Sequence, residues 1–221
     1  MNGLAPEQRA ALAATGVLDL QHPEVRAAAE RALADGAEDD TAKAVAFYYA
    51  VRDGISYEVF GTGLSETDLK ASSILKARRG FCLHKAILFA ALCRSQGIPC
   101  RIAAARVRNH ISSPNLTKLV GGDVFLHWFN QVWLQGRWIK AAPVFNRLLC
   151  RIYRIPPLEF DGTGDAFVQG HVAGQEMQYL DTPVLFEAPT AEQLVQHVAS
   201  HHPLMVPASL RVPREREIAA L

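Results

Sequence analysis

The chain has 221 residues, of which 49% are hydrophobic and 20% are charged, and its formal net charge is +1. These values are typical of a folded chain with one domain and an extension, and they exclude a largely disordered protein. The balanced charge gives no reason to expect a nucleic-acid partner, and we see neither a run of about 20 apolar residues nor a secretory signal, so we expect a cytoplasmic protein without membrane association.

The beginning of the chain is predicted to be helical. Residues 5–34 are rich in Ala, Arg, Glu and Leu and favour two short helices, with Pro23 suited to the first turn of the second one. After a polar loop, Thr41 is the expected N-cap of a helix over residues 42–52, where apolar side chains recur at helical spacing.

The strongest helix signal follows a polar stretch over residues 61–79, which we expect to be a surface loop with a short helix. Residues 83–96 are mostly apolar helix formers, and Gly97 suits the position just after a helix end. Cys82 stands at the start of this helix. Residues 98–107 are typical of a loop that enters a strand.

An antiparallel hairpin is predicted next. Residues 125–134 and 137–142 are rich in aromatic and β-branched side chains, and Gln135-Gly136 between them suits a tight turn. A helix followed by an antiparallel sheet indicates the α+β class, because a βαβ repeat would alternate the two element types.

The pattern weakens after the hairpin. Residues 150–190 predict an irregular extension, and residues 191–202 predict a further helix. We therefore divide the chain into an N-terminal helical segment (1–40), a core (41–146) and a C-terminal extension packed on that core (147–221). The extension could cover a cleft or extend the sheet.

Cys82 is the cysteine best placed for catalysis. The free amides at a helix start, together with the positive end of the helix dipole, favour a thiolate and can hold a developing oxyanion. Gly80 would allow the close backbone approach that such a site requires. Cys93 and Cys100 fit small buried hydrophobic residues instead. We expect reduced thiols throughout, and the absence of a CxxC pair argues against a structural zinc site.

Two blocks of the sequence resemble segments of transglutaminase-like proteins. The first, RGFCLHKA at residues 79–86 with the exit GIPCR at residues 97–101, is similar to the nucleophile segment of that family. The second, HWFNQV at residues 127–132 with GRW at residues 136–138, is similar to its His strand and return strand. The resemblance covers about residues 40–146, and the chain also resembles a bacterial subgroup of that family whose role is undefined.

The resemblance implies a papain-like fold, in which a nucleophile helix packs on an antiparallel sheet that bears the catalytic histidine. It implies that Cys82 is the nucleophile, and that His127 accepts the thiol proton and later returns one to the leaving amine. Without the resemblance, Cys82 could equally be a buried structural cysteine, and His127 a solvated or core histidine of the strand.

One position departs from the family pattern. An Asp usually follows the return-strand Trp by four residues, and here that position is Ala142. Another group could orient His127, and by their chemistry four side chains are candidates: Asn130, Asn146, Asp161 and Asp165. Alternatively, a Cys–His dyad works at a reduced rate, or the domain has lost catalysis.

Several other side chains are candidates for a role at the site. Tyr57 is a candidate oxyanion donor, and Phe81 and Trp128 are candidates to line a substrate cleft. His197 and His201 have the i, i+4 spacing of a metal pair, but no carboxylate or cysteine completes the set. We therefore expect no metal and no cofactor.

The leading hypothesis for function is thiol-dependent acyl transfer or hydrolysis on an amide or peptide, through an acyl-enzyme at Cys82. The alternative is a non-catalytic domain that binds a peptide or protein in the cleft between helix and sheet. A Cys82 that is partly exposed and within hydrogen-bond reach of His127 would favour the enzyme, whereas a fully buried or averted Cys82 would favour the binding domain.

Overall fold

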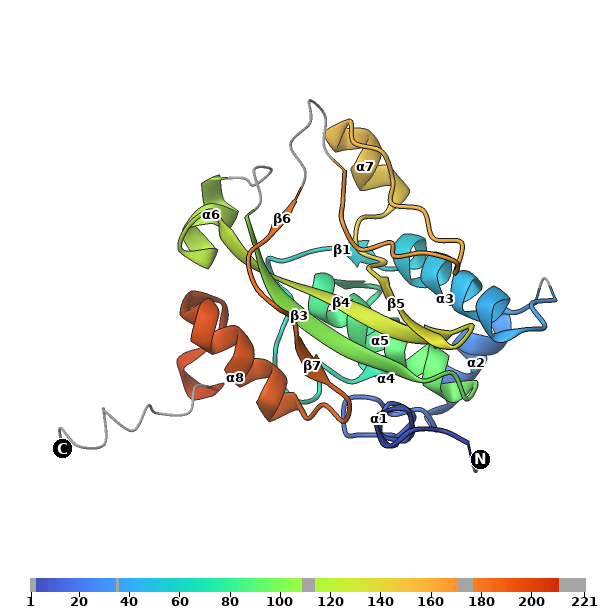
Figure 1. Ribbon diagram of the computed structural model, residues 1–221. Helices are drawn as coiled ribbons and strands as arrows, with labels where there is room; N and C mark the ends of the chain where they lie inside the picture. The colour runs from blue at the N-terminus through green and yellow to red at the C-terminus, as the bar shows by residue number, and fades with distance from the viewer. Residues whose placement is uncertain (1–2, 35, 109–113, 171–176, 211–221) are drawn as a thin grey trace.

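A computed structural model describes residues 3–34, 36–108, 114–170 and 177–210, and it shows helices arranged around one main sheet (Figure 1). The helices are α1 (Pro6–Ala10), α2 (Pro23–Ala32), α3 (Asp40–Gly54), α4 (Ala71–Ala77), α5 (Cys82–Ser95), α6 (Pro114–Val120), α7 (Arg147–Tyr153) and α8 (Ala191–His201), followed by the short 3-10 turns η1 (Pro203–Met205) and η2 (Ala208–Leu210). The strands are β1 (Ser56–Tyr57), β2 (Arg79–Gly80), β3 (Cys100–Arg108), β4 (Val124–Leu134), β5 (Arg137–Ala141), β6 (Gln178–Tyr179) and β7 (Val184–Phe186).

The main sheet is antiparallel, with the order β5-β4-β3-β6 and with β7 also paired to β3. The long β3–β4 pair places Ala105 opposite His127, and the β4–β5 hairpin turns at Gln135 and Gly136. Both turn residues have positive φ, 51° and 79°, as a two-residue hairpin turn that follows the strand twist requires. The predicted hairpin and the predicted α+β class are confirmed.

Helix α5 packs on this sheet and forms the centre of the core, as Figure 1 shows. Every side chain from Cys82 to Arg94 is buried, as expected for a helix that is apolar on all sides. Three polar residues are buried in this helix: His84, Lys85 and Arg94. Lys85 is satisfied, because its Nζ donates to the carbonyls of Arg52 at 2.9 Å and Ile55 at 2.7 Å, at the C-terminal end of α3. The predicted helix over residues 83–96 is confirmed.

The start of α3 differs from the prediction. Its N-cap is Asp39, whose carboxylate accepts a hydrogen bond from the amide of Ala42 at 2.8 Å, so the expected N-cap Thr41 is wrong. A carboxylate is a stronger acceptor than a hydroxyl at the positive end of a helix, and this accounts for the choice of Asp39.

The C-terminal extension holds regular elements within a segment that we predicted to be irregular. Strands β6 and β7 pair with β3, and α7 lies beyond the end of β5 (Figure 1). These strands have only two or three residues, so their pairing with β3, rather than their own residue pattern, makes them strands. The predicted final helix is confirmed as α8, which begins with a capping box of Thr190 and Gln193.

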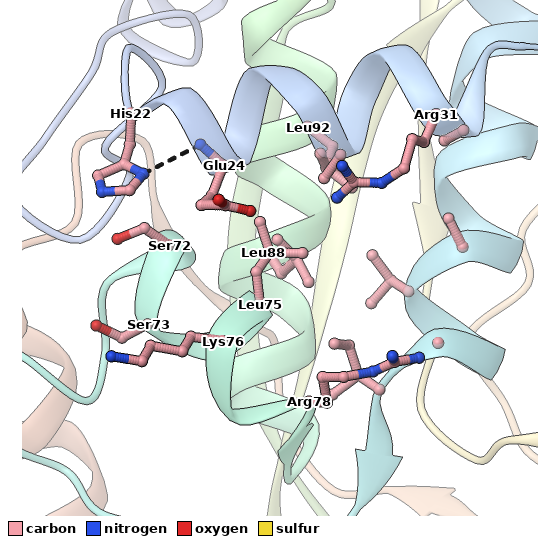
Figure 2. A pocket seen from close by; sticks show the side chains of 16 residues that line it. His22, Glu24, Arg31, Ser72, Ser73, Leu75, Lys76, Arg78, Leu88 and Leu92 are labelled. Atoms are coloured by element: carbon pink, nitrogen blue, oxygen red, sulfur yellow. Dashed lines mark hydrogen bonds between the residues drawn. The ribbon is translucent and has the colours of Figure 1, made fainter.

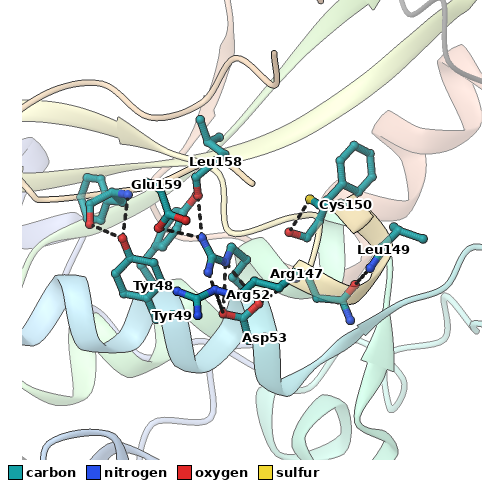
Figure 3. A network of polar contacts seen from close by, with 12 residues as sticks. Tyr48, Tyr49, Arg52, Asp53, Arg147, Leu149, Cys150, Leu158 and Glu159 are labelled. Carbon is teal, nitrogen blue, oxygen red and sulfur yellow. Dashed lines mark hydrogen bonds and ion pairs between the residues drawn. The ribbon is translucent and has the colours of Figure 1, made fainter. Parts of the chain in front are cut away.

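A buried arginine fastens the extension to α3 (Figure 3). The Arg52 side chain is fully buried and donates to the Leu158 carbonyl at 2.9 Å and to the Glu159 carboxylate at 3.1 Å, while it also pairs with Asp53 at 2.8 Å. The hydroxyl of Tyr48 donates to the same Leu158 carbonyl at 2.9 Å. Residues 147–170 are therefore held against the core by polar contacts as well as by packing.

Replacing Arg52 with methionine is expected to lower the free energy of unfolding by about 2–3 kcal/mol, because the carbonyl of Leu158 and two carboxylates lose a buried charged donor. Chemical denaturation measures the change. The matched control is Arg108→Met, which removes the exposed ion pair with Asp123 at 3.2 Å and should cost less than about 1 kcal/mol. Equal losses in the two variants would contradict the anchoring role of Arg52.

Candidate active site

Cys82 is the first residue of α5, and its thiol lies against the backbone of β4 on both sides of His127. Its Sγ is 4.0 Å from the Leu126 carbonyl, and the amide of Trp128 donates toward it. The amides of Cys82 and Leu83 at the helix start also face the sulfur. Backbone N–H groups thus surround the thiol, and Cys82 as a whole is only 6% exposed.

Gly80, two residues before Cys82, lies where α5 comes too close to leave room for a side chain. A Cβ on Gly80 would lie 2.4 Å from the Cβ of His84, a contact that side chains do not make. His84 cannot move aside easily, because it is 1% exposed and its Nε2 lies 3.0 Å from the Gly63 carbonyl. The sequence suggested a close backbone approach at Gly80, and the packing of His84 supplies the physical reason.

Substituting Gly80 with alanine is therefore expected to lower the free energy of unfolding by about 1–3 kcal/mol, since His84 and the start of α5 must shift. The comparison is Gly164→Ala, where an added Cβ would meet nothing within 4 Å, so no loss of stability is expected. Thermal denaturation of both variants measures the difference. An unchanged Gly80→Ala protein would show that the helix start can rearrange without cost.

Burial outweighs the helix start in setting the charge of Cys82. The surrounding amides lower the pKa of the thiol, but desolvation is the largest effect and raises it to about 11. The sequence led us to expect that the helix start favours a thiolate; the folded protein instead holds a neutral thiol near pH 7.

His127 lies on β4 and is 7% exposed. Its ring packs near Phe129, with centroids 6.2 Å apart, and near Tyr179, with centroids 6.1 Å apart. Burial lowers its pKa to about 4, and the Phe167 backbone opposes that shift as a hydrogen-bond acceptor. Among the described residues its buried Nε2 has no hydrogen-bond partner of normal geometry. The imidazole is therefore neutral near pH 7, as a proton acceptor must be.

Cys82 and His127 line the same cavity, which has a volume of about 210 Å³. Most of its other walls are apolar, with Phe125, Val144 and Phe145 from the core among them. The extension contributes four further side chains: Leu149, Tyr153, Ile155 and Met177. The extension therefore both covers this cavity and adds strands to the sheet.

The structure brings the candidate oxyanion donor Tyr57 and the predicted cleft residues Phe81 and Trp128 close to Cys82. Tyr57 lines the cavity of Cys82 and His127, and it packs edge-on against Phe145. Phe81, Trp128 and Tyr57 also line an adjoining cavity of about 40 Å³ together with Cys82. Trp128 is 1% exposed, so most of its ring lies in the core.

The side chains predicted to orient His127 are engaged elsewhere in the described structure. Asn130 lies three residues after His127 and so points to the opposite face of β4, where its Nδ2 donates to the Ala86 carbonyl at 2.9 Å. Asn146 is the N-cap of α7 and accepts from the amide of Leu149 at 3.3 Å. The two aspartates bond to groups other than the imidazole: Asp161 accepts from Thr163, and Asp165 accepts from the amide of Lys140.

Two groups that lie near His127 in the structure could not be recognised as its neighbours from the sequence. The first is the main chain of Phe167, and the second is the hydroxyl of Tyr179, which donates to the Phe167 carbonyl at 3.1 Å. A backbone carbonyl is present at every residue, so no residue pattern could have singled out Phe167.

A second and larger cavity, of about 780 Å³, lies among α2, α3, α4 and α5, and Figure 2 shows its lining. It contains Ser72 and His22, but they are not arranged as a nucleophile and its base. Ser72 donates to the Asp19 carboxylate rather than to an imidazole, and the Nδ1 of His22 accepts from the amide of Glu24 at 3.2 Å. The smaller cavity is therefore the better candidate for catalysis.

Metal ligands do not gather within the described part of the chain. In residues 3–34, 36–108, 114–170 and 177–210, no group of three His, Cys, Asp or Glu side chains could hold a metal ion. The His197 and His201 rings lie 4.7 Å apart, and the His201 Nδ1 is 2.9 Å from the His197 carbonyl. Over the same ranges, no helix combines the length and apolarity needed to cross a membrane.

A family model described as the transglutaminase-like superfamily matches residues 27–143, just over half of the chain. Among curated proteins, none matches the sequence.

Two solved structures are similar at low identity. One is a crystal structure of a putative cysteine protease from Cytophaga hutchinsonii, with 17% identity and a TM-score of 0.49, over 83% of this chain and 54% of that one. The other is a putative protease from Parabacteroides distasonis, with 15% identity and a TM-score of 0.38, over 62% of this chain and 27% of that one. The chain thus spans about half the length of the first of these proteins.

Proposed function

The chain belongs to the transglutaminase-like superfamily, and from that premise we propose that it carries out thiol-dependent acyl transfer or hydrolysis on an amide or peptide substrate. The Cys82 sulfur attacks the carbonyl carbon while His127 takes the thiol proton. His127 then protonates the leaving amine as the C–N bond breaks, which leaves an acyl-enzyme. Water or a second amine attacks this thioester, and the thiol regains its proton as the acyl group departs.

The observation that carries the proposal is the position of Cys82 at the helix start, in a cavity that His127 also lines. When the carbonyl becomes tetrahedral, its oxygen gains negative charge. The free amides of Cys82 and Leu83 can donate to that oxygen without reorganising. The same amides are too weak to ionise the buried thiol, so their main contribution comes in the transition state.

The pair is proposed to start from its neutral form. With the pKa of Cys82 raised to about 11 and that of His127 lowered to about 4, burial favours thiol and imidazole over thiolate and imidazolium. Proton transfer then accompanies carbon–sulfur bond formation, with His127 acting as a general base.

The lining of the cavity supports an apolar acyl group. Apart from the proposed catalytic pair, Glu58 is the only charged residue in the described lining, and its carboxylate already accepts from the amide of Phe60 at 2.8 Å. An acidic acyl side chain would lose its hydration without gaining a positively charged partner from the described lining, and it would meet the like charge of Glu58. We therefore propose amides or peptides with a hydrophobic residue on the acyl side as substrates, and hydrolysis as the more general outcome.

The direct test is covalent labelling with a short peptide that ends in a thiol-reactive ketone, followed by mass spectrometry of the intact protein and of its tryptic peptides. A probe with leucine next to the reactive group should add once, at Cys82, and a probe with aspartate there should react at least about tenfold more slowly. The fully buried Cys93 and Cys100 serve as internal controls. Absence of labelling at Cys82 with every probe would overturn the proposal.

The alternative function, a non-catalytic domain that binds a peptide, is favoured by one observation. Cys82 is only 6% exposed, and in the described structure the Nε2 of His127 makes no hydrogen bond to its thiol or to any other group. A peptide that binds in the cavity without modification of Cys82, with equal affinity for Cys82→Ala, would establish this alternative. The four free thiols are compatible with the cytoplasmic location that we expect.

A further inference from the structure

The larger cavity takes no part in the proposed reaction. It has a volume of about 780 Å³ and lies where α2, α3 and α4 pack around α5 (Figure 2). Within the described residues, it shares no lining side chain with the cavity of Cys82 and His127. Sites for small molecules are commonly about 300–1,000 Å³ in volume, so this cavity is large enough to hold a ligand of its own.

The cavity is open because small residues face it from two helices. Ala28 and Ala32 stand one turn apart on α2, and Ala50 and Gly54 stand one turn apart at the end of α3. Residues four positions apart lie on the same face of a helix, so each pair forms a strip without bulky side chains. Protein interiors usually fill such space, because unfilled volume loses dispersion contacts. The two strips leave it unfilled.

The floor of the cavity is apolar. It is formed by Leu88 and Leu92, which stand one turn apart on α5 and are buried, and Leu75 of α4 borders it. A hydrocarbon group placed against these side chains would leave water for apolar surroundings, which is favourable in proportion to the area buried. The floor therefore favours a ligand with an apolar part.

Positive charge surrounds this floor. Three cationic side chains line the cavity: Arg31 of α2, Lys76 of α4 and Arg78 at the C-cap of α4. Within the described residues, none of the three side chains forms a hydrogen bond or an ion pair. Glu24 is the one acidic residue of the described lining. In Figure 2 the apolar floor lies between Arg31 and Arg78, so two unpaired guanidinium groups border it from different sides.

We propose that this cavity binds an amphiphilic anion, whose carboxylate or phosphate group pairs with Arg31 and Arg78 while its hydrocarbon part lies on the leucines of α4 and α5. A guanidinium group presents two parallel N–H donors, which match the oxygens of either head group. An exposed ion pair is weak by itself, so the ligand needs both its charge and its apolar part. The inference does not rest on the proposed function, because the two cavities have separate linings.

The test measures the binding of decanoate and of decyl phosphate, each below its micelle concentration, by isothermal titration calorimetry. Both probes should bind at one site, and the tighter of the two identifies the preferred head group. Decyltrimethylammonium has the same chain with a positive charge, and it should bind at least about tenfold more weakly. Amide chemical shifts should change at residues 24–32 and 72–78 on addition of either anion, and not around Cys82.

Two variants remove one charge each. Arg31→Met and Arg78→Met should each weaken the binding of the tighter anion by about tenfold, because a charged donor is lost while the apolar floor is kept. Arg26→Met is the matched control: Arg26 is an exposed arginine of the same helix α2, it bonds to Gln21, and it does not line the cavity. Affinity in this control should stay within about twofold of the wild type.

A third variant removes the space and keeps every charge. In Ala28→Leu/Ala32→Leu the strip on α2 is filled, so binding should be lost while the melting temperature shows that the protein remains folded. Equal affinity for the anions and the cation, chemical shifts confined to the cavity of Cys82, or no binding to the wild type would overturn the inference. Labelling of Cys82 by the peptide ketone is measured separately, so failure of the anion site leaves the proposed function standing, and an inert Cys82 leaves the anion site standing.

Discussion

Replacing Cys82 with alanine is expected to lower turnover of any amide substrate by a factor of about 10⁴ to 10⁶, and replacing His127 with glutamine should have an effect of similar size. The alanine variant lacks the atom that forms the acyl-enzyme. The glutamine variant keeps a polar side chain at the cavity but cannot accept the proton of a thiol whose pKa is about 11. Steady-state kinetics on a peptide amide with a hydrophobic acyl residue measures both.

Because the two groups act as a unit, the double variant should be no slower than Cys82→Ala alone. The control is Cys150→Ala, which removes a buried thiol that bonds to the Phe145 carbonyl at 3.6 Å and takes no part in the proposed reaction. Its turnover should remain within about threefold of the wild type. Turnover that survives in Cys82→Ala would assign the activity to another group and remove the basis of the proposed mechanism.

The reactivity of Cys82 toward iodoacetamide is expected to rise about tenfold with each pH unit between pH 7 and pH 10. The thiolate is the reactive form, and a pKa of about 11 leaves only about one part in 10⁴ of the thiol ionised at pH 7. The sign follows from burial, which raises the pKa of an acid by disfavouring its charged form. Mass spectrometry of the Cys82 peptide at each pH measures the rate.

Turnover should follow a different profile, because His127 removes the proton during the reaction. The pKa of His127 is lowered to about 4, so the neutral base is present at higher pH and is lost as the pH falls through about 4.

In the alkylation experiment, a simple thiol measured in parallel corrects for the reactivity of iodoacetamide itself at each pH. A rate of alkylation that is flat from pH 5 to pH 9 and falls in His127→Ala would contradict the neutral pair and establish a thiolate–imidazolium pair.

The elements that could be predicted from the sequence are those whose signals are local. The α5 helix follows from a run of apolar helix formers that ends at Gly97, and the β4–β5 hairpin follows from alternating large side chains around Gln135-Gly136. The sequence predicts Thr41 as the N-cap of α3, whereas the structure has Asp39, because two acceptor residues stand close together and only the folded backbone selects between them.

The C-terminal extension could be predicted only in part. The α8 helix has its own capping box, so its residue pattern was sufficient. Strands β6 and β7 form because β3 offers them hydrogen-bonding partners. Helix α7 is held near the cavity by two contacts with α3: the amide of Arg147 donates to the Asp53 carboxylate, and Arg52 donates to the Leu158 carbonyl. Such contacts join residues between 70 and 106 positions apart, and a local pattern carries no information on them.

For the candidate site, the sequence by itself determined which side chains could do the chemistry. Cys82 at a helix start and His127 on a strand are marked by their residue types and by their spacing in two blocks. The sequence also kept Asn130 as a candidate to orient His127, and the structure turns it toward the Ala86 carbonyl instead. Ala142 likewise showed from the sequence alone that no carboxylate follows the return strand.

The tertiary structure alone decided the charge of the pair and the group that faces the imidazole. Burial by residues from the core and the extension makes the Cys82 thiol and the His127 imidazole neutral, although a helix start taken alone favours the thiolate. The main chain of Phe167, which follows the bridge between Ala141 and Ala166, comes near the imidazole from the extension. The physical reason is common to both: desolvation and main-chain hydrogen bonding depend on which distant segments come together, and neither is encoded in the identity of a single residue.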